Sequence, residues 1–172
     1  DHLLAFPVLS KYFEQLNAGD LVVVTPDVGG IKLARNYSKK LGIKMAIVDK
    51  RRIGPEETEV GFVIGDVANK NIVMIDDLIA TGGSIAQAAR VLKERGAKDI
   101  YVGATHPVFC GAAIQKLSAA PIKEIVVTDT IPLNEKAKEL GSKIKVLSIS
   151  GLLGDAISRI HRHESVSSLF VQ

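Results

Sequence analysis

The sequence has little of what several large protein classes need. Its 172 residues include one cysteine and no tryptophan, and 5% of them are aromatic. The single cysteine, Cys110, excludes an internal disulfide framework and a zinc cluster of cysteines, and it fits a reducing cytoplasm. No apolar run reaches the roughly 20 residues that a membrane span needs, and no basic amino-terminal region leads into a signal-peptide core. We therefore expect a cytoplasmic protein that has no membrane partner.

The excess of one charge sign over the other is also small. The formal net charge is +3, from 22 basic and 19 acidic side chains. This balance, and the shortage of aromatic rings for base stacking, argue against a nucleic-acid partner and suit small phosphorylated ligands better. With 47% hydrophobic residues the chain can bury one ordinary core, so residues 1–172 are expected to form a single domain.

Short β-branched apolar runs alternate with segments of helical periodicity. The runs read as buried strands at residues 21–25, 44–49, 71–76, 100–106, 123–129 and 144–150. The helical segments between them are 31–41, 84–95, 112–119 and 152–161. This alternation predicts an α/β fold with a doubly wound, mainly parallel sheet flanked by helices. In such sheets ligands bind at the carboxyl ends of the strands.

The strongest chemical motif occupies residues 73–84, where an apolar strand ends in two acids and a glycine turn opens a helix. The glycines let backbone N–H groups approach an anion, hydroxyls add donors, and the helix presents its positive end. Asp76 and Asp77 can accept hydrogen bonds from the vicinal hydroxyls of a sugar, or contact a magnesium ion. A sugar 5-phosphate would fit both the phosphate-binding turn and the pair of acids. The predicted phosphate cradle consists of Thr81, Gly82, Gly83 and Ser84.

Two other segments follow strands. Asp27, Gly29 and Gly30 form a second candidate anion loop, in which the acid can hold a divalent cation and the glycines expose backbone donors. From the residues alone a plain turn between strand and helix is an equal alternative. Lys50, next to Arg51 and Arg52, enters a loop that runs to residue 59. Such a charge run is usually a solvated surface, but cations on a closing loop are what phosphoryl transfer requires.

The 73–84 string resembles the phosphoribosyl pyrophosphate motif of the type I phosphoribosyltransferases. Six further segments resemble the ribose-phosphate pyrophosphokinase family, in order along the chain: 23–30, 49–52, 65–67, 104–109, 127–132 and 164–170. The resemblance spans the chain but matches only the later part of that family's polypeptide. It implies a type I phosphoribosyltransferase-like fold and transfer of pyrophosphate from Mg-ATP to ribose 5-phosphate, giving phosphoribosyl pyrophosphate and AMP.

The resemblance also implies roles for particular residues. The acid at Asp27 would bind Mg²⁺, and its loop, with Gly29 and Gly30, would handle the pyrophosphate. Lys50 and Arg52 would be catalytic and substrate-binding. The stretch 164–170 resembles one associated with regulation by phosphate or ADP at subunit contacts, which would fit a homo-oligomer. An ordinary docked tail is an equal alternative for this stretch.

Departures from the family pattern keep other functions open. Ala80 stands where family members generally have an acid, and the adenine-binding region and one metal motif would lie upstream of residue 1. The chain alone is therefore expected to bind ribose phosphate better than ATP and to need a companion amino-terminal part. The alternatives are a nucleobase phosphoribosyltransferase that consumes phosphoribosyl pyrophosphate, and a non-catalytic regulatory or assembly subunit.

Overall fold

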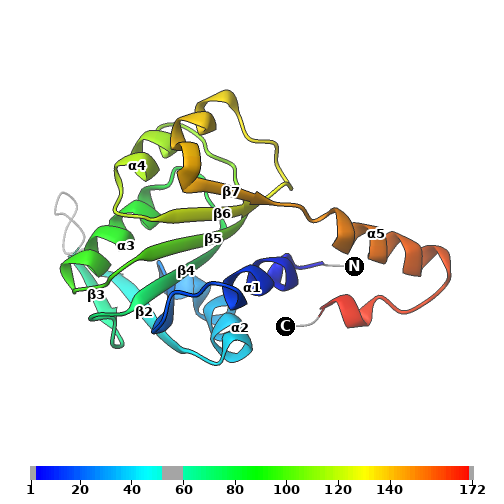
Figure 1. Ribbon diagram of the computed structural model, residues 1–172, viewed down its shortest axis with the longest axis horizontal. Coiled ribbons are helices and arrows are strands. Elements are labelled where there is room, and N and C mark those ends of the chain that lie inside the picture. The colour runs from blue at the N-terminus through cyan, green and yellow to red at the C-terminus, as the bar shows by residue number, and fades with distance from the viewer. Residues whose placement is uncertain (1–2, 52–59, 171–172) are drawn as a thin grey trace.

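The computed structural model describes residues 3–51 and 60–170, and within them the chain forms a seven-stranded sheet (Figure 1). The strand order is β3-β2-β1-β4-β5-β6-β7. Every neighbouring pair is parallel except β2 and β3, which are antiparallel. The strands are β1 (Leu21–Thr25), β2 (Lys44–Arg51), β3 (Val60–Ile64), β4 (Asn71–Leu78), β5 (Ile100–His106), β6 (Glu124–Thr128) and β7 (Ile144–Leu147).

Helices cover both faces of this sheet because successive strand residues point to opposite sides. On β4, Ile72 and Met74 join one buried cluster, whereas Val73 and Ile75 join the other. The first cluster is completed by α3 (Gly83–Glu94), α4 (Ala113–Ala119) and the 3-10 segment η2 (Glu135–Lys143). The second is completed by α1 (Phe6–Glu14) and α2 (Ile31–Leu41). This arrangement confirms the predicted doubly wound, mainly parallel α/β fold.

Several boundaries differ from those predicted. The strand expected to end at residue 49 continues to Arg51, and the one expected to end at 76 continues to Leu78. The last strand, expected to run to residue 150, ends at Leu147. The following helix α5 (Ser150–His161) begins at Ser150, two residues earlier than predicted. The helix α1, the antiparallel edge strand β3 and the 3-10 segments, of which η2 is the longest, were not predicted.

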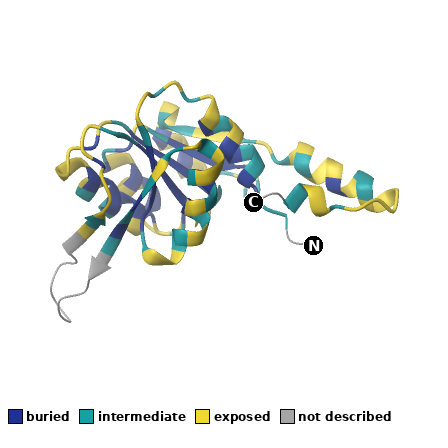
Figure 2. Ribbon diagram, turned by 90° about the horizontal axis from the view of Figure 1, so that it is seen from below, coloured by how far each residue is buried: buried dark blue, intermediate teal, exposed yellow. Residues whose placement is uncertain are grey.

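Helix α5 and the short 3-10 turn η3 (Ser167–Phe170) extend away from the sheet in both views (Figures 1 and 2). Ala156 is buried, but Leu153, Ile157 and Ile160 remain 42%, 67% and 58% exposed. Their spacing of four and three residues places them on one face of the helix. No helix in the described part of the chain is long and apolar enough to cross a membrane.

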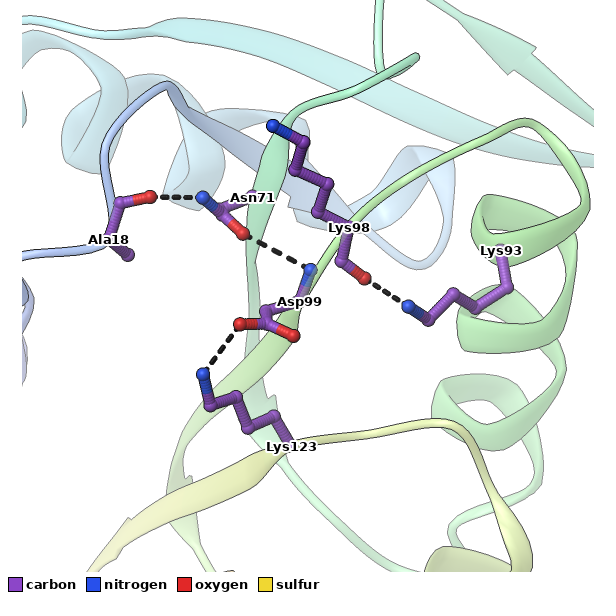
Figure 3. A network of polar contacts seen from close by, with 6 residues as sticks. All are labelled: Ala18, Asn71, Lys93, Lys98, Asp99 and Lys123. Atoms are coloured by element: carbon purple, nitrogen blue, oxygen red, sulfur yellow. Dashed lines mark hydrogen bonds and ion pairs between the residues drawn. The ribbon is translucent and has the colours of Figure 1, made fainter.

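Polar side chains at the amino ends of the strands bond to the neighbouring backbone and to one another (Figure 3). Asn71, the first residue of β4, donates from Nδ2 to the Ala18 carbonyl and accepts from the Asp99 amide at 3.1 Å. The Asp99 carboxylate lies 2.5 Å from Nζ of Lys123. These bonds join the segments that lead into β1, β4, β5 and β6. At this end of the sheet, called the amino edge below, polar groups are therefore bonded to partners within the protein.

Candidate functional site

The carboxyl ends of β1 and β4 meet at the opposite edge, because the two strands are parallel and paired. The loop after β1 and the turn after β4 therefore lie together, as predicted. They enclose a cavity of about 290 Å³, lined by Asp27, Asp76, Asp77, Leu78, Ile79, Ala80, Thr81, Gly82, Gly83, Ser84 and Ile85. The residues predicted to contact the sugar phosphate thus share one cavity with the acid of the second loop.

The cradle is the turn that starts α3. Gly82 has φ 67° and ψ 0°, a left-handed conformation that glycine adopts without steric cost. A Cβ at Gly82 would also lie 3.1 Å from Cγ of Leu117, which packs behind the turn from α4. No side chain caps the start of α3. The first amides of the helix, with the exposed hydroxyls of Thr81 and Ser84, are therefore placed to bind an anion.

The loop after β1 is built differently from what was expected. Oδ1 of Asp27 accepts hydrogen bonds from the Gly29 amide at 2.9 Å and the Gly30 amide at 3.2 Å. In this conformation the two glycine amides are therefore paired with Asp27, and their role as donors to an anion stays a prediction. The physical reason is that an acid at the start of a helical turn satisfies the first amides of that turn itself. A Cβ at Gly30 would lie 2.2 Å from Oγ1 of Thr25, so glycine is required there.

Both acids of the motif lie within β4, which was expected to end at Asp76. Asp76 is half-buried and Asp77 is exposed. Burial is the main cause that raises the pKa of Asp76 to about 6, and the neighbouring carboxylates of Asp77 and Asp27 add to it, although the hydrogen bond from the Asp77 amide opposes the shift. An uncompensated cluster of acids of this kind favours a cation or hydroxyl donors as its partner.

The fit of a magnesium ion depends on these same acids. Among the described residues, no three His, Cys, Asp or Glu side chains lie close enough to hold a metal by themselves. Mg²⁺ is usually held by one or two carboxylates together with water and the oxygens of a phosphorylated substrate. Asp27 and Asp76 supply carboxylates of this kind beside a candidate phosphate site. The residues therefore fit a magnesium ion that arrives with its ligand.

A second cavity, of about 610 Å³, adjoins the first and shares its three acids. Its other lining residues are Leu4, Gly29, Gly30, Lys32, Leu33 and Asn36. Sequence reasoning did not identify Leu33 and Asn36, although their spacing after Gly29 and Gly30 places them on the same face of α2. Two adjoining cavities that share one acid cluster suit a reaction between two ligands.

Lys50 lies in β2, where its backbone pairs with Gly61 of β3. It therefore belongs to a strand rather than to the start of a loop. The side chain of Lys50 and all of residues 52–59, including Arg52, lie outside the described residues. The roles expected for Lys50 and Arg52 stay predictions.

Comparison with known proteins agrees with this geometry. Residues 51–171 match the family model described as phosphoribosyl synthetase-associated domain. A ribose-phosphate pyrophosphokinase from Caldanaerobacter subterraneus subsp. tengcongensis is 50% identical over 171 residues, which cover 99% of this chain and 54% of the relative. One from Oceanobacillus iheyensis is 45% identical over 170 residues, covering 99% and 53%. This chain thus spans about half the length of the relatives that it matches.

Solved structures give the same result. The phosphoribosylpyrophosphate synthetase of Mycobacterium smegmatis superposes with a TM-score of 0.85 at 36% identity, over 95% of this chain and 52% of that one. The purine phosphoribosyltransferase of Pyrococcus horikoshii has a TM-score of 0.52 at 24% identity, over 62% of this chain and 74% of that one, which shows a shared fold alone. Neither the nucleobase transferase nor the non-catalytic subunit is favoured by these similarities.

Proposed function

Because this chain belongs to the phosphoribosyl synthetase-associated domain family, we propose that it is the ribose-5-phosphate-binding and catalytic part of a ribose-phosphate pyrophosphokinase. Such an enzyme transfers pyrophosphate from ATP to ribose 5-phosphate and forms phosphoribosyl pyrophosphate and AMP. The observation that carries the proposal is the uncapped start of α3 beside Asp76 and Asp77, in a single cavity. The product gives nucleotide biosynthesis its activated ribose, and we place the enzyme in the cytoplasm.

The sugar phosphate would bind with its two ends on different chemical groups. Its phosphate oxygens would accept hydrogen bonds from the amides and hydroxyls of the cradle, Thr81, Gly82, Gly83 and Ser84. Its ribose hydroxyls would donate to Asp76 and Asp77, which are acceptors when ionised. Since Ala80 has no polar side chain, the ribose receives no further side-chain contact from that position.

A magnesium ion fits next to these groups. Asp27 and Asp76 would hold it, and it would neutralise charge on the phosphate oxygens. The Asp27 loop, with Gly29 and Gly30, would adjoin the pyrophosphate that is transferred. For its glycine amides to bind that pyrophosphate, their present bonds to Asp27 have to open.

Transfer itself needs no covalent intermediate with the protein. The anomeric oxygen of ribose 5-phosphate attacks the β-phosphorus of ATP, the bond between that phosphorus and the oxygen bridging it to the α-phosphorus breaks, and AMP leaves. The proton of the anomeric hydroxyl is released. Lys50 and Arg52 would neutralise the charge that spreads over the equatorial oxygens. Holding the two substrates in line lowers the remaining activation barrier.

The remainder of the site is proposed to come from an amino-terminal polypeptide like the unmatched half of the relatives. The exposed face of α5, formed by Leu153, Ile157 and Ile160, is the surface to which we assign it. A twelve-residue helix is marginal in water without packing, so this face requires a partner. The match to the Mycobacterium smegmatis structure covers 95% of this chain but only 52% of that longer chain. Homo-oligomer formation and regulation by phosphate or ADP belong to the same proposal.

The test is an assay of AMP release from ATP and ribose 5-phosphate. The chain alone should have little activity. When ATP is not held in place, the activation barrier is not lowered by proximity, an effect on the order of 7 to 11 kcal/mol. Adding the amino-terminal half of a relative should restore activity, and Lys50→Ala should abolish the restored activity. Ile157→Asp should reduce restoration without changing ribose 5-phosphate binding. Full activity of the chain alone would contradict the proposed division of the site.

A further inference from the structure

Helix α4 packs directly against the back of the cradle. Leu117 contacts the turn at Gly82, and Lys116, one residue earlier in α4, reaches the next glycine. A Cβ placed on Gly83 would lie 3.7 Å from Nζ of Lys116 and 3.7 Å from Oγ1 of Thr81. The ammonium group of Lys116 therefore lies beside the same glycine as a hydroxyl already assigned to the phosphate. Its side chain is exposed.

The cavity has a shortage of positive charge that this lysine can correct. Within the described residues its lining contains three carboxylates, those of Asp27, Asp76 and Asp77, and no lysine or arginine. A phosphate monoester carries roughly −1.5 to −2 charges at neutral pH. Amides and hydroxyls can bond its oxygens, but they do not offset the repulsion from three acids nearby. A cation close to the phosphate end of the ligand does.

We infer that Lys116 is a further substrate-binding residue, and that its ammonium binds the phosphate group of the sugar 5-phosphate held in the cradle. The inference rests on the proposed function, since it assumes that the cradle binds this ligand. Lys116 is not among the residues that line the cavity, so its side chain must turn toward the phosphate. A lysine suits this role because its compact charge sits on a flexible four-carbon stem.

A purely structural role for Lys116 makes a different prediction. The residue lies in the last turn of α4, where a cation interacts favourably with the negative end of the helix. In that case its removal would change stability and leave ligand affinity alone. Lys39 provides a matched control, because it is an exposed lysine in the last turn of α2. Helix α2 ends where β2 begins, so Lys39 lies toward the opposite edge of the sheet.

The experiment is calorimetric titration of the 172-residue chain with ribose 5-phosphate and, separately, with unphosphorylated ribose. Lys116→Ala should weaken ribose 5-phosphate binding by roughly tenfold, the usual loss for a hydrogen bond to a charged group. Lys116→Arg should stay within about threefold of wild type, and Lys39→Ala should match wild type. Binding of ribose should be equally weak in all four proteins, since it has no phosphate to contact.

The possible failures are separable. If the wild type binds ribose 5-phosphate and Lys116→Ala binds it equally well, the role of Lys116 is wrong and the proposed function stands. If Lys116→Ala and Lys39→Ala weaken binding alike, the effect is general electrostatics and the inference is also wrong. If the wild type itself binds no ribose 5-phosphate, the proposed function fails together with the inference.

Discussion

The two edges of the sheet use similar polar residues for opposite purposes. At the amino edge, the Asn71 side chain bonds to the backbone of Ala18 and Asp99, and the Asp99 carboxylate pairs with Lys123. These polar groups therefore stabilise the fold. At the carboxyl edge, Asp76 and Asp77 stand together, and the adjoining helix start has no side-chain cap. The first edge has its partners within the chain, whereas the second leaves donors and acceptors for a ligand. Substitutions at the two edges should therefore separate stability from binding.

The largest effect is expected for Gly82→Ala at the carboxyl edge. The left-handed conformation and the close approach of Leu117 together should lower the free energy of unfolding by about 3 kcal/mol, and displacing the turn should abolish measurable ribose 5-phosphate binding. Chemical denaturation and calorimetric titration measure the two results.

Gly96 offers a matched control at the other end of α3. It also has a positive φ, 84°, but the nearest atoms to an added Cβ lie 3.8 Å away. Gly96→Ala should lower the free energy of unfolding by only about 1 kcal/mol and leave binding unchanged. Equal loss of binding in both variants would mean that strain anywhere in α3 disturbs the site, and the contrast between the edges would not hold.

At the amino edge, Asn71→Ala should lower the free energy of unfolding by about 2 kcal/mol without changing ribose 5-phosphate affinity. The substitution removes both partners of Asn71 at once, the Ala18 carbonyl and the Asp99 amide, and leaves these groups partly buried without a bond. Urea denaturation gives the stability change, provided that the slope with denaturant is unaltered. A loss of affinity as large as the loss of stability would show that the two edges are coupled.

The grouping of acids and glycines at the carboxyl edge could be predicted from the sequence, whereas the hydrogen bonds of the amino edge, which depend on tertiary contacts, could not. The cradle was predicted because an apolar strand, two acids and a glycine turn all occur within twelve consecutive residues. Helix α1 was missed although Phe6, Leu9 and Phe13 have helical spacing, because no motif marks that segment. Strand β3 was missed because it includes Gly61 and pairs only at an edge.

The Asp27 loop shows a limit of a different kind. The sequence correctly placed an acid next to two glycines at the end of a strand. It did not reveal that the carboxylate accepts hydrogen bonds from both glycine amides, because capping its own turn and binding a cation use the same oxygen atoms. Which of the two occurs is decided by the surrounding fold and by the ligand.

A smaller effect of opposite sign is expected for Asp76→Asn. The folded pKa of about 6 exceeds the ordinary value of 3.8, so the folded state holds the proton more tightly and the stability of the wild type falls as pH rises from about 4 to 6. An uncharged Asn removes that penalty. At pH 8 without ligand or metal the variant should be more stable by about 1 kcal/mol, a value reduced for partial exposure to solvent.

The measurement for Asp76→Asn is thermal unfolding at pH 4.5 and at pH 8. The gain should be fully present at pH 8 and markedly smaller at pH 4.5, where the folded wild type keeps Asp76 protonated but the unfolded chain is already mostly ionised. Affinity for ribose 5-phosphate should fall in the same variant, because a carboxylate acceptor is lost. A variant that is less stable than the wild type at pH 8 would contradict the view that this edge gives up stability for binding.

The smallest effect is expected for Lys123→Ala at the amino edge. Lys123 lies 2.5 Å from the Asp99 carboxylate, but the two side chains are 55% and 46% exposed, so water and salt screen the pair. The pairing with Asp99 raises the pKa of Lys123, so its contribution is present at neutral pH and is lost only as pH rises through that raised pKa. The melting temperature should fall by no more than about 2 °C, and 1 M salt should remove the difference. Scanning calorimetry at low and high salt measures both.

A large loss of stability that persists in salt would contradict this expectation. It would show that Asp99 needs Lys123 to hold its backbone amide against Asn71. The amino edge would then act as one cooperative network rather than as separate bonds.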